Sequence, residues 1–225
     1  MLLQLNDICV KNILKNLTLN VKKGEFVLIV GANGAGKTTL FNTISGASSP
    51  NNGSVFINGR DITLLDRHKR SAQISSVLQD PRAGTIAEMT IFENLKLAYL
   101  RNRCIKKYRK IVEYFKEKLS LIGLNLENRM NEYVRNLSGG QRQALSLVMA
   151  TVGDYELLLL DEITAALDTR TSDMVMEITS KIVANEKKTC LAITHDQSHM
   201  NLFGDRTLKM ENGQLSGFDK RSEPC

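Results

Sequence analysis

The first chemically informative segment is the glycine-rich run Gly31–Thr39, which reads GANGAGKTT and directly follows the apolar run Phe26–Val30. This spacing predicts a loop whose backbone N–H groups surround phosphates at the start of a helix. Lys37 would reach the β- and γ-phosphates of a nucleoside triphosphate, and the Thr38 hydroxyl would bind Mg²⁺. The alternative is a turn that only joins a strand to a helix. The expected phosphate contacts are Gly31, Asn33, Gly34, Ala35, Gly36, Lys37, Thr38 and Thr39.

A pair of adjacent carboxylates ends the apolar run Leu157–Leu160, which is typical of a strand buried on both faces. Successive strand residues point to opposite sides, so Asp161 and Glu162 are expected to differ in role. Asp161 is the candidate Mg²⁺ ligand, because a hard cation prefers oxygen. Glu162 would orient the water that attacks the γ-phosphate. Otherwise, two acids simply end a strand at the solvent edge.

A third motif, Leu137-Ser138-Gly139-Gly140-Gln141-Arg142-Gln143, opens a segment with apolar residues at helical spacing. Ser138 is a candidate helix N-cap, and Gly139 and Gly140 would leave the N-terminus open to an anion. Because the chain already has one phosphate loop, a second anion site suggests two subunits that share one nucleotide. A capped helix start without a ligand is the alternative.

Together, these motifs resemble the nucleotide-binding subunits of ABC transporters, from about residue 2 to about residue 218. Gly31–Thr39 is similar to the family's Walker A motif, Leu157–Glu162 to its Walker B motif and Leu137–Gln143 to its signature motif. The resemblance implies a P-loop NTPase of RecA-like α/β fold that binds ATP and Mg²⁺ and hydrolyses ATP. It also implies catalytic roles for Lys37 and Glu162.

The resemblance extends to two more single residues. Gln79 falls where the family places the glutamine that contacts Mg²⁺ and water and responds to the membrane partner. His195 follows the strand-like run Thr189–Thr194, at the position of the histidine that contacts the γ-phosphate. Ala165-Ala166-Leu167-Asp168 matches the loop that crosses the family's dimer interface.

Some residues depart from the family pattern. Ala165 stands where Ser is more common, and Ile163 stands where Pro is more common. Residues 1–25 contain no Phe, Tyr or Trp to stack on adenine. Cys9, Val10 and Lys11 lie near the expected place, so weaker apolar packing on the base is expected. Discrimination between ATP and GTP should therefore be modest.

The elements that must position these residues can also be read from the sequence. Strand-like runs at 2–5, 17–21, 26–30 and 53–57 suggest an antiparallel β-subdomain beside a mostly parallel core sheet. Between Gln79 and Leu137 the pattern is helical, with apolar residues three or four apart. The chain is expected to be one domain, residues 1–225, with a helical subdomain at 80–137. The helical pattern is carried by Tyr108, Ile111, Val112, Phe115, Leu119 and Ile122.

Composition limits the remaining possibilities. The 225 residues contain no apolar run long enough to span a membrane and no basic-then-apolar leader, which predicts work in the cytosol. The cysteines, Cys9, Cys104, Cys190 and Cys225, form no CxxC pair, and His195 with His199 lacks further zinc ligands.

Most of the net charge of +6 lies in residues 80–140, especially Arg101–Lys110. That surface could meet anionic lipid, an acidic partner or solvent. No RNA-reading motif is present, so nucleic acid is not expected.

By resemblance, each ATP lies between Gly31–Thr39 of one copy and Ser138–Gly140 of the other, in a head-to-tail homodimer. The dimer is expected on the cytoplasmic face of the inner membrane, docked on two transmembrane permease subunits. Asp80–Thr85 and Met89–Leu95 look like the bacterial importer group for amino acids, which uses an extracytoplasmic substrate-binding protein. Alternatives are an exporter motor, a soluble ABC-type ATPase of translation or DNA repair, and an inactive regulatory module.

Overall fold

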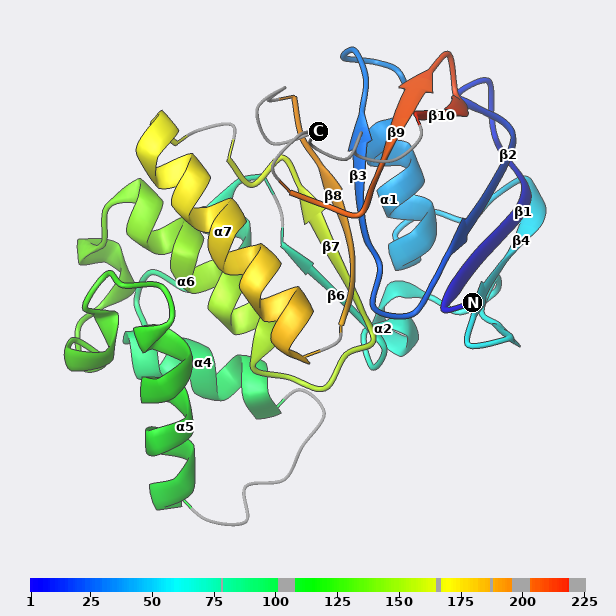
Figure 1. Cartoon of the computed structure of the whole chain (residues 1–225). Helices are drawn as coiled ribbons and strands as arrows, with labels where there is room; N and C mark the ends of the chain where they lie inside the picture. Colours follow the sequence, from blue (N-terminus) through cyan, green and yellow to red (C-terminus); the bar gives the residue numbers. More distant parts are fainter. Residues whose placement is uncertain (78, 101–107, 165–166, 187, 196–202, 219–225) are drawn as a thin grey trace.

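Two β-sheets form the framework of the protein (Figure 1). The computed structural model describes residues 1–77, 79–100, 108–164, 167–186, 188–195 and 203–218. The smaller sheet is antiparallel, with strand order β2-β1-β4-β5, and the larger has the order β10-β9-β3-β8-β7-β6. The smaller sheet contains β1 (Leu3–Val10), β2 (Leu14–Val21), β4 (Asn52–Ile57) and β5 (Arg60–Asp61). The larger contains β3 (Phe26–Val30), β6 (Ile74–Val77), β7 (Leu157–Asp161), β8 (Thr189–Ile193), β9 (Arg206–Glu211) and β10 (Gln214–Phe218).

The larger sheet is parallel except for its edge hairpin. β6, β7, β8, β3 and β9 pair in parallel, and β10 pairs antiparallel with β9. Strands β3, β7 and β8 are almost entirely buried, as expected for apolar runs covered on both faces. The expected combination of a mostly parallel core sheet with an antiparallel sheet and helices is confirmed.

Strand β1 is longer than the sequence predicted. The polar residues Asn6 and Asp7 interrupt the apolar pattern after Leu5. The pairing with β2 shifts register between Leu5 and Ile8, and Asp7 has a positive φ of 48°. A β-bulge therefore absorbs the polar residues, and the strand continues to Val10.

The helices lie on both faces of the core sheet. In Figure 1, α1 lies between the two sheets, and α4, α5, α6 and α7 gather on the other side of the core sheet. The predicted helical pattern from Tyr108 is confirmed as α5, although Ile122 lies just beyond its end. The helices are α1 (Lys37–Ser45), α2 (Arg67–Arg70), α3 (Pro81–Gly84), α4 (Ile91–Leu100), α5 (Tyr108–Ser120), α6 (Gly139–Thr151) and α7 (Thr169–Glu186), with 3₁₀ turns at Leu126–Asn128 and Val134–Asn136.

Side-chain alternation along the core strands divides the interior into two hydrophobic clusters. Leu157 and Leu159 of β7 belong to the cluster that includes α1 and the antiparallel sheet. Leu158 and Leu160 belong to the cluster built with α4, α5, α6 and α7. Helices α1 and α6 therefore pack on opposite faces of one sheet.

Several predictions fall outside the described residues. They concern Ala165 and Ala166 of the interface loop, residues 101–107 of the basic run, His199, Cys104 and Cys225. The boundaries of the helical subdomain, 80 and 137, stay a prediction. Within the described ranges, no helix has both the length and the apolar character needed to cross a membrane.

Candidate nucleotide-binding and catalytic site

The phosphate loop joins the end of β3 to the start of α1. Lys37, the first residue of α1, is only 5% exposed, and its Nζ donates to the carbonyls of Gly31 (2.8 Å) and Ala32 (3.1 Å). Gly36 occupies the N-cap position with a φ of 108°, where a side chain would be strained and would press against Met210. Gly36 has no side chain that could cap α1, and N–H groups at a helix start without a side-chain cap are suited to an anion.

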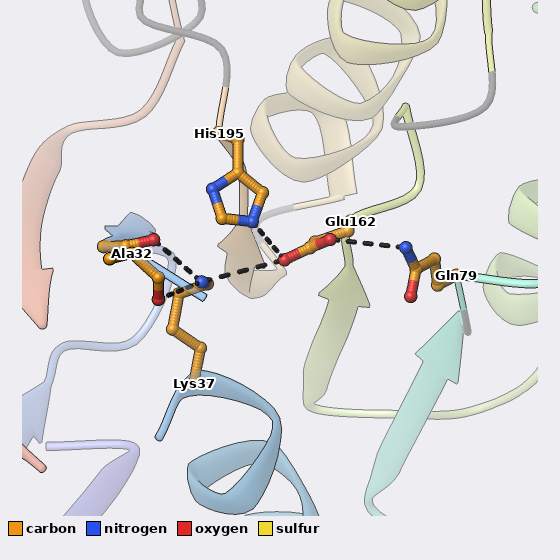
Figure 2. A network of polar contacts seen from close by, with 6 residues as sticks. Ala32, Lys37, Gln79, Glu162 and His195 are labelled. Carbon is orange, nitrogen blue, oxygen red and sulfur yellow. Dashed lines mark hydrogen bonds and ion pairs between the residues drawn. The ribbon is translucent and has the colours of Figure 1, made fainter. Parts of the chain in front are cut away.

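Glu162 is the centre of a polar network that joins four predicted site residues (Figure 2). Its Oε1 lies 2.5 Å from Nε2 of His195 and 3.8 Å from Nζ of Lys37. Its Oε2 accepts a hydrogen bond of 3.4 Å from Nε2 of Gln79. The structure thus brings together Lys37, Gln79, Glu162 and His195, which come from four different elements or their ends. The side chains of Lys37, Gln79 and His195 therefore all point to one anion, the Glu162 carboxylate.

The backbone at Glu162 explains how it reaches this network. β7 ends at Asp161, and Glu162 has a φ of 49°, in the left-handed region that few residues other than glycine adopt. Its N–H donates to the Ile193 carbonyl at 3.2 Å. Glu162 therefore lies in a turn beyond the end of β7, so strand alternation does not set its direction. A non-glycine residue in this region often marks a functional position.

Asp161 has an environment suited to a cation. Partial burial raises its pKa, the neighbouring Glu162 charge raises it further, and Lys37 partly offsets both. A carboxylate in this condition lacks a full compensating charge, which a divalent cation would supply. The Thr38 hydroxyl and Gln79 amide add oxygen donors of the kind Mg²⁺ prefers. Among the described residues, no three His, Cys, Asp or Glu side chains gather as a metal cage.

An open pocket of about 450 Å³ lies over the phosphate loop. It contains one apolar side chain that the sequence analysis missed, Ile13, which is 41% exposed. Cys9, Val10 and Lys11, expected near the base, do not line this pocket, and the Sγ–H of Cys9 donates to Oδ1 of Asn16. The missed signal is an apolar residue that directly follows Lys11 and Asn12 in the β1–β2 turn. The other lining residues are Asn33, Gly34, Gly36, Lys37, Thr38, Thr39, Gln79 and Glu162.

The turn between β9 and β10 fixes Ile13 relative to the phosphate loop. The N–H of Gly213 donates to the Ala35 carbonyl at 3.0 Å, and the N–H of Lys15 donates to the Gly213 carbonyl at 3.1 Å. One glycine therefore bridges the loop and the β1–β2 hairpin. The antiparallel sheet supplies the wall beside the phosphates.

The signature segment forms a separate surface. Ser138 is confirmed as the N-cap of α6: its hydroxyl accepts from the Gln141 N–H at 3.2 Å, and the Gln141 side chain accepts from the Ser138 N–H at 3.1 Å. Ser138 and Gly139 are exposed, and Gly140 is partly buried. Ser138, Gly139 and Gly140 do not line the pocket over the phosphate loop. The structure therefore does not unite the two predicted anion sites within one chain.

Comparison with known proteins decides the family. The family described as ABC transporter matches residues 14–165 of the chain. The chain belongs to the ABC transporter family. It is an ATP-binding, ATP-hydrolysing subunit with the P-loop NTPase fold, as the motifs implied.

Individual relatives place this ABC ATPase more closely. A tyrosine transport ATP-binding protein of Clostridioides difficile is 40% identical over 219 residues, covering 94% of this chain and 86% of the relative. The carnitine transport ATP-binding protein OpuCA of Listeria monocytogenes is 34% identical over 213 residues, and the match covers 95% of this chain and 52% of OpuCA. Among solved structures, the ATP-binding cassette MJ0796 of Methanocaldococcus jannaschii, a dimer bound to ADP and Pi in a post-hydrolysis state, has a TM-score of 0.83. It is 28% identical, and the match covers 97% of this chain and 98% of that one.

Proposed function

We propose that this ABC ATPase powers an importer for an amino acid or a similar small solute. The observation that carries the catalytic part is the convergence of Lys37, Gln79 and His195 on the Glu162 carboxylate, beside an open pocket. The substrate class is supported by the 40% identity to a tyrosine transport ATP-binding protein. The cargo itself would be chosen by other subunits.

The same geometry suggests a role for each side chain. Lys37 and the N–H groups at the start of α1 would hold the β- and γ-phosphates, so that Lys37 would pair with the phosphates instead of with Glu162. Glu162, released from Lys37, would accept a hydrogen bond from the attacking water. His195 would contact the γ-phosphate, and Gln79 would hold the water in line. Mg²⁺, bound at Thr38, Asp161 and Gln79, would neutralise charge that develops on the phosphates.

Two copies are proposed to act together. The phosphate loop and the signature segment belong to helices α1 and α6, which pack on opposite faces of the core sheet. Ser138 of one chain is therefore badly placed to serve its own pocket, whereas a two-fold, head-to-tail dimer would bring it to the pocket of the other copy. The MJ0796 cassette forms a dimer, which supports this arrangement.

A second hollow is proposed as the contact with the membrane subunits. It has a volume of about 200 Å³ and lies where β6 meets α4 and α6. Leu97, 51% exposed, and Ser76 are among its lining residues, and Ser76 precedes Gln79 by three positions in the chain. An apolar helix of a permease would cover the leucine and would lie close to the segment that carries Gln79. The protein would then be peripheral at the cytoplasmic face of the membrane, in a system that includes an extracytoplasmic binding protein.

Uptake of labelled tyrosine by the source cells tests the proposal. Deleting the gene should abolish uptake, and supplying the intact chain should restore it. Supplying the Glu162→Gln chain should not restore it, because transport requires hydrolysis. Normal tyrosine uptake in the deletion strain would reject this substrate. Phosphate release by the purified chain, which should require Mg²⁺, tests the enzyme separately.

A further inference from the structure

Arg142 connects the signature motif to the segment that follows Gln79. It lies on the first turn of α6, where its N–H bonds to the Ser138 carbonyl at 2.9 Å. Its Nε donates to Oγ1 of Thr85 at 2.5 Å, and its Nη2 donates to the Thr85 carbonyl at 3.3 Å. Thr85 is 7% exposed. Charge-assisted hydrogen bonds that are shielded from water are among the stronger polar contacts in a protein.

Thr85 belongs to a short segment that is held from two sides. Asn94 of α4 is fully buried and bonds both backbone groups of Ile86: Oδ1 accepts from the Ile86 N–H at 2.8 Å, and Nδ2 donates to its carbonyl at 3.0 Å. On the other side, Gly84 lies so close to α6 that an added Cβ would be 2.6 Å from Oγ of Ser146. Residues 84–86 are therefore anchored to α4 through Asn94 and lie against α6 at Gly84.

The same segment lines the hollow proposed for the permease. Gly84 and Ser146 are lining residues, as are Leu97 and Ala98 of α4. The wall of that hollow and the start of α6 are thus joined through residues 84–86. Among these contacts, those made by Arg142 lie nearest to Ser138, one helical turn away.

We propose that Arg142 is a positioning residue that holds Ser138–Gly140 in register with the wall of the hollow. This inference rests on the proposed function, in which the signature segment contacts the ATP of a second copy. Through the Arg142–Thr85 contact, a shift of residues 84–86 when the hollow is filled would reorient the N-terminus of α6. Without the Arg142–Thr85 contact, the signature segment would be positioned less precisely against the ATP of the second copy. The phosphate loop would bind nucleotide as before.

Dimer formation by the purified chain tests this role, with Glu162→Gln as the parent so that ATP is not consumed. Sedimentation in the presence of Mg²⁺ would give the ATP concentration at half dimerisation. Arg142→Ala and Thr85→Val should each raise it about tenfold, as expected for loss of a charge-assisted contact. Arg142→Lys, which keeps one donor, should recover part of the loss. ADP affinity of the monomer should stay unchanged, which a general loss of structure would not allow.

Arg135→Ala is the matched control. Arg135 lies just before α6 in the chain and forms an ion pair with Glu88 at 2.8 Å, with the two side chains 55% and 73% exposed. This exposed pair should contribute little, so dimerisation should match the parent. Parental dimerisation by Arg142→Ala, or a parallel fall in its ADP affinity, would overturn the positioning role. A parent that stays monomeric at every ATP concentration would overturn the proposed function and the inference with it.

The link to the hollow has its own readout. The chain contains no tryptophan, so Leu97→Trp would place a single fluorescent reporter in the hollow. In the Glu162→Gln parent, dimerisation with ATP should change the tryptophan emission. In the Arg142→Ala variant at saturating ATP, dimers should form with at most about half of that change. An equal change in both proteins would overturn the coupling.

Discussion

The two surfaces proposed to meet at ATP are built in different ways. On the phosphate side, Lys37, Gln79 and His195 contact Glu162, so a carboxylate of the same chain holds the donors in place. On the signature side, the Ser138 hydroxyl serves its own helix as a cap, and Gly139 is open to solvent. The first surface is organised by the chain itself, and the second presents a helix terminus to another molecule.

This difference separates binding from assembly. A change on the phosphate side should alter nucleotide binding or hydrolysis in a single chain. A change on the signature side should alter the assembly of two chains and leave nucleotide binding by a single chain unchanged. Substitutions on either side can therefore test this division.

The largest effect is expected from Glu162→Gln. The amide keeps the volume but cannot act as an anionic acceptor, so phosphate release should fall about 10²–10⁴-fold. It also removes the negative charge near Lys37, so ATP should still bind and an ATP-bound dimer should accumulate. Phosphate-release assays and size-exclusion chromatography with ATP and Mg²⁺ check both results. Hydrolysis at the parental rate would exclude Glu162 as the base.

Lys37→Ala should have the next largest effect. It removes the buried cation that is proposed to hold the β/γ-phosphates, and also its bonds to the loop carbonyls of Gly31 and Ala32. ATP affinity should fall about 100-fold, and dimerisation should be lost with it. Equilibrium titration measures the dissociation constant. An unchanged constant would contradict the assignment of the phosphate loop, and thermal unfolding without nucleotide would reveal any damage to the loop itself.

Ser138 offers the opposite pattern. Ser138→Ala should leave ADP and ATP binding by the monomer unchanged but weaken ATP-driven dimerisation about tenfold, with about 1 kcal/mol of lost stability from the missing cap. Ser138→Asn is the control, since Asn keeps the cap and loses the hydroxyl. If monomer affinity falls with either substitution, the signature segment serves its own chain and the proposed division is wrong.

The sequence predicted the parts of the molecule that depend on local patterns. The strands at Phe26 and Leu157, the N-cap at Ser138 and the loop before Lys37 follow from apolar runs, capping chemistry and glycine spacing. It could not supply the contacts that depend on tertiary placement. No local pattern in the sequence encodes the left-handed turn at Glu162. Nor does one encode the bond from Arg142 to Thr85, which lie far apart in the chain.

Ile13 is the residue whose role was missed and can be tested directly. It is the apolar wall of the pocket, so Ile13→Ala should lower ATP affinity about fivefold. Ile13→Tyr should raise it by a similar factor, because stacking on a base is stronger than aliphatic contact. Competition between ATP and GTP in the parent should show less than about hundredfold discrimination, which corresponds to about 2.7 kcal/mol. Unchanged affinity in both variants would mean that the base lies elsewhere.

The smallest effect concerns stability. Because burial and the Glu162 charge raise the pKa of Asp161 in the folded protein, the ionised form of Asp161 destabilises the fold in the absence of nucleotide. Its contribution to stability is therefore full below its unfolded pKa and is lost as the pH rises through the folded pKa. Asp161→Asn should raise the free energy of unfolding of the nucleotide-free protein at neutral pH, and this gain should shrink toward acidic pH.

Bound nucleotide should reverse the order of stability of the parent and the Asp161→Asn variant. With Mg²⁺ and ATP, the parent gains binding energy that Asp161→Asn lacks, so the parent should unfold at the higher temperature. Glu117→Gln, which removes an exposed carboxylate on α5, is the control and should follow the parent in both conditions. Thermal unfolding at several pH values, with and without Mg²⁺-ATP, measures both effects. If Asp161→Asn is less stable without nucleotide at neutral pH, Asp161 is held by partners within the fold, and the cost of an unpaired carboxylate cannot be part of how this site attracts Mg²⁺.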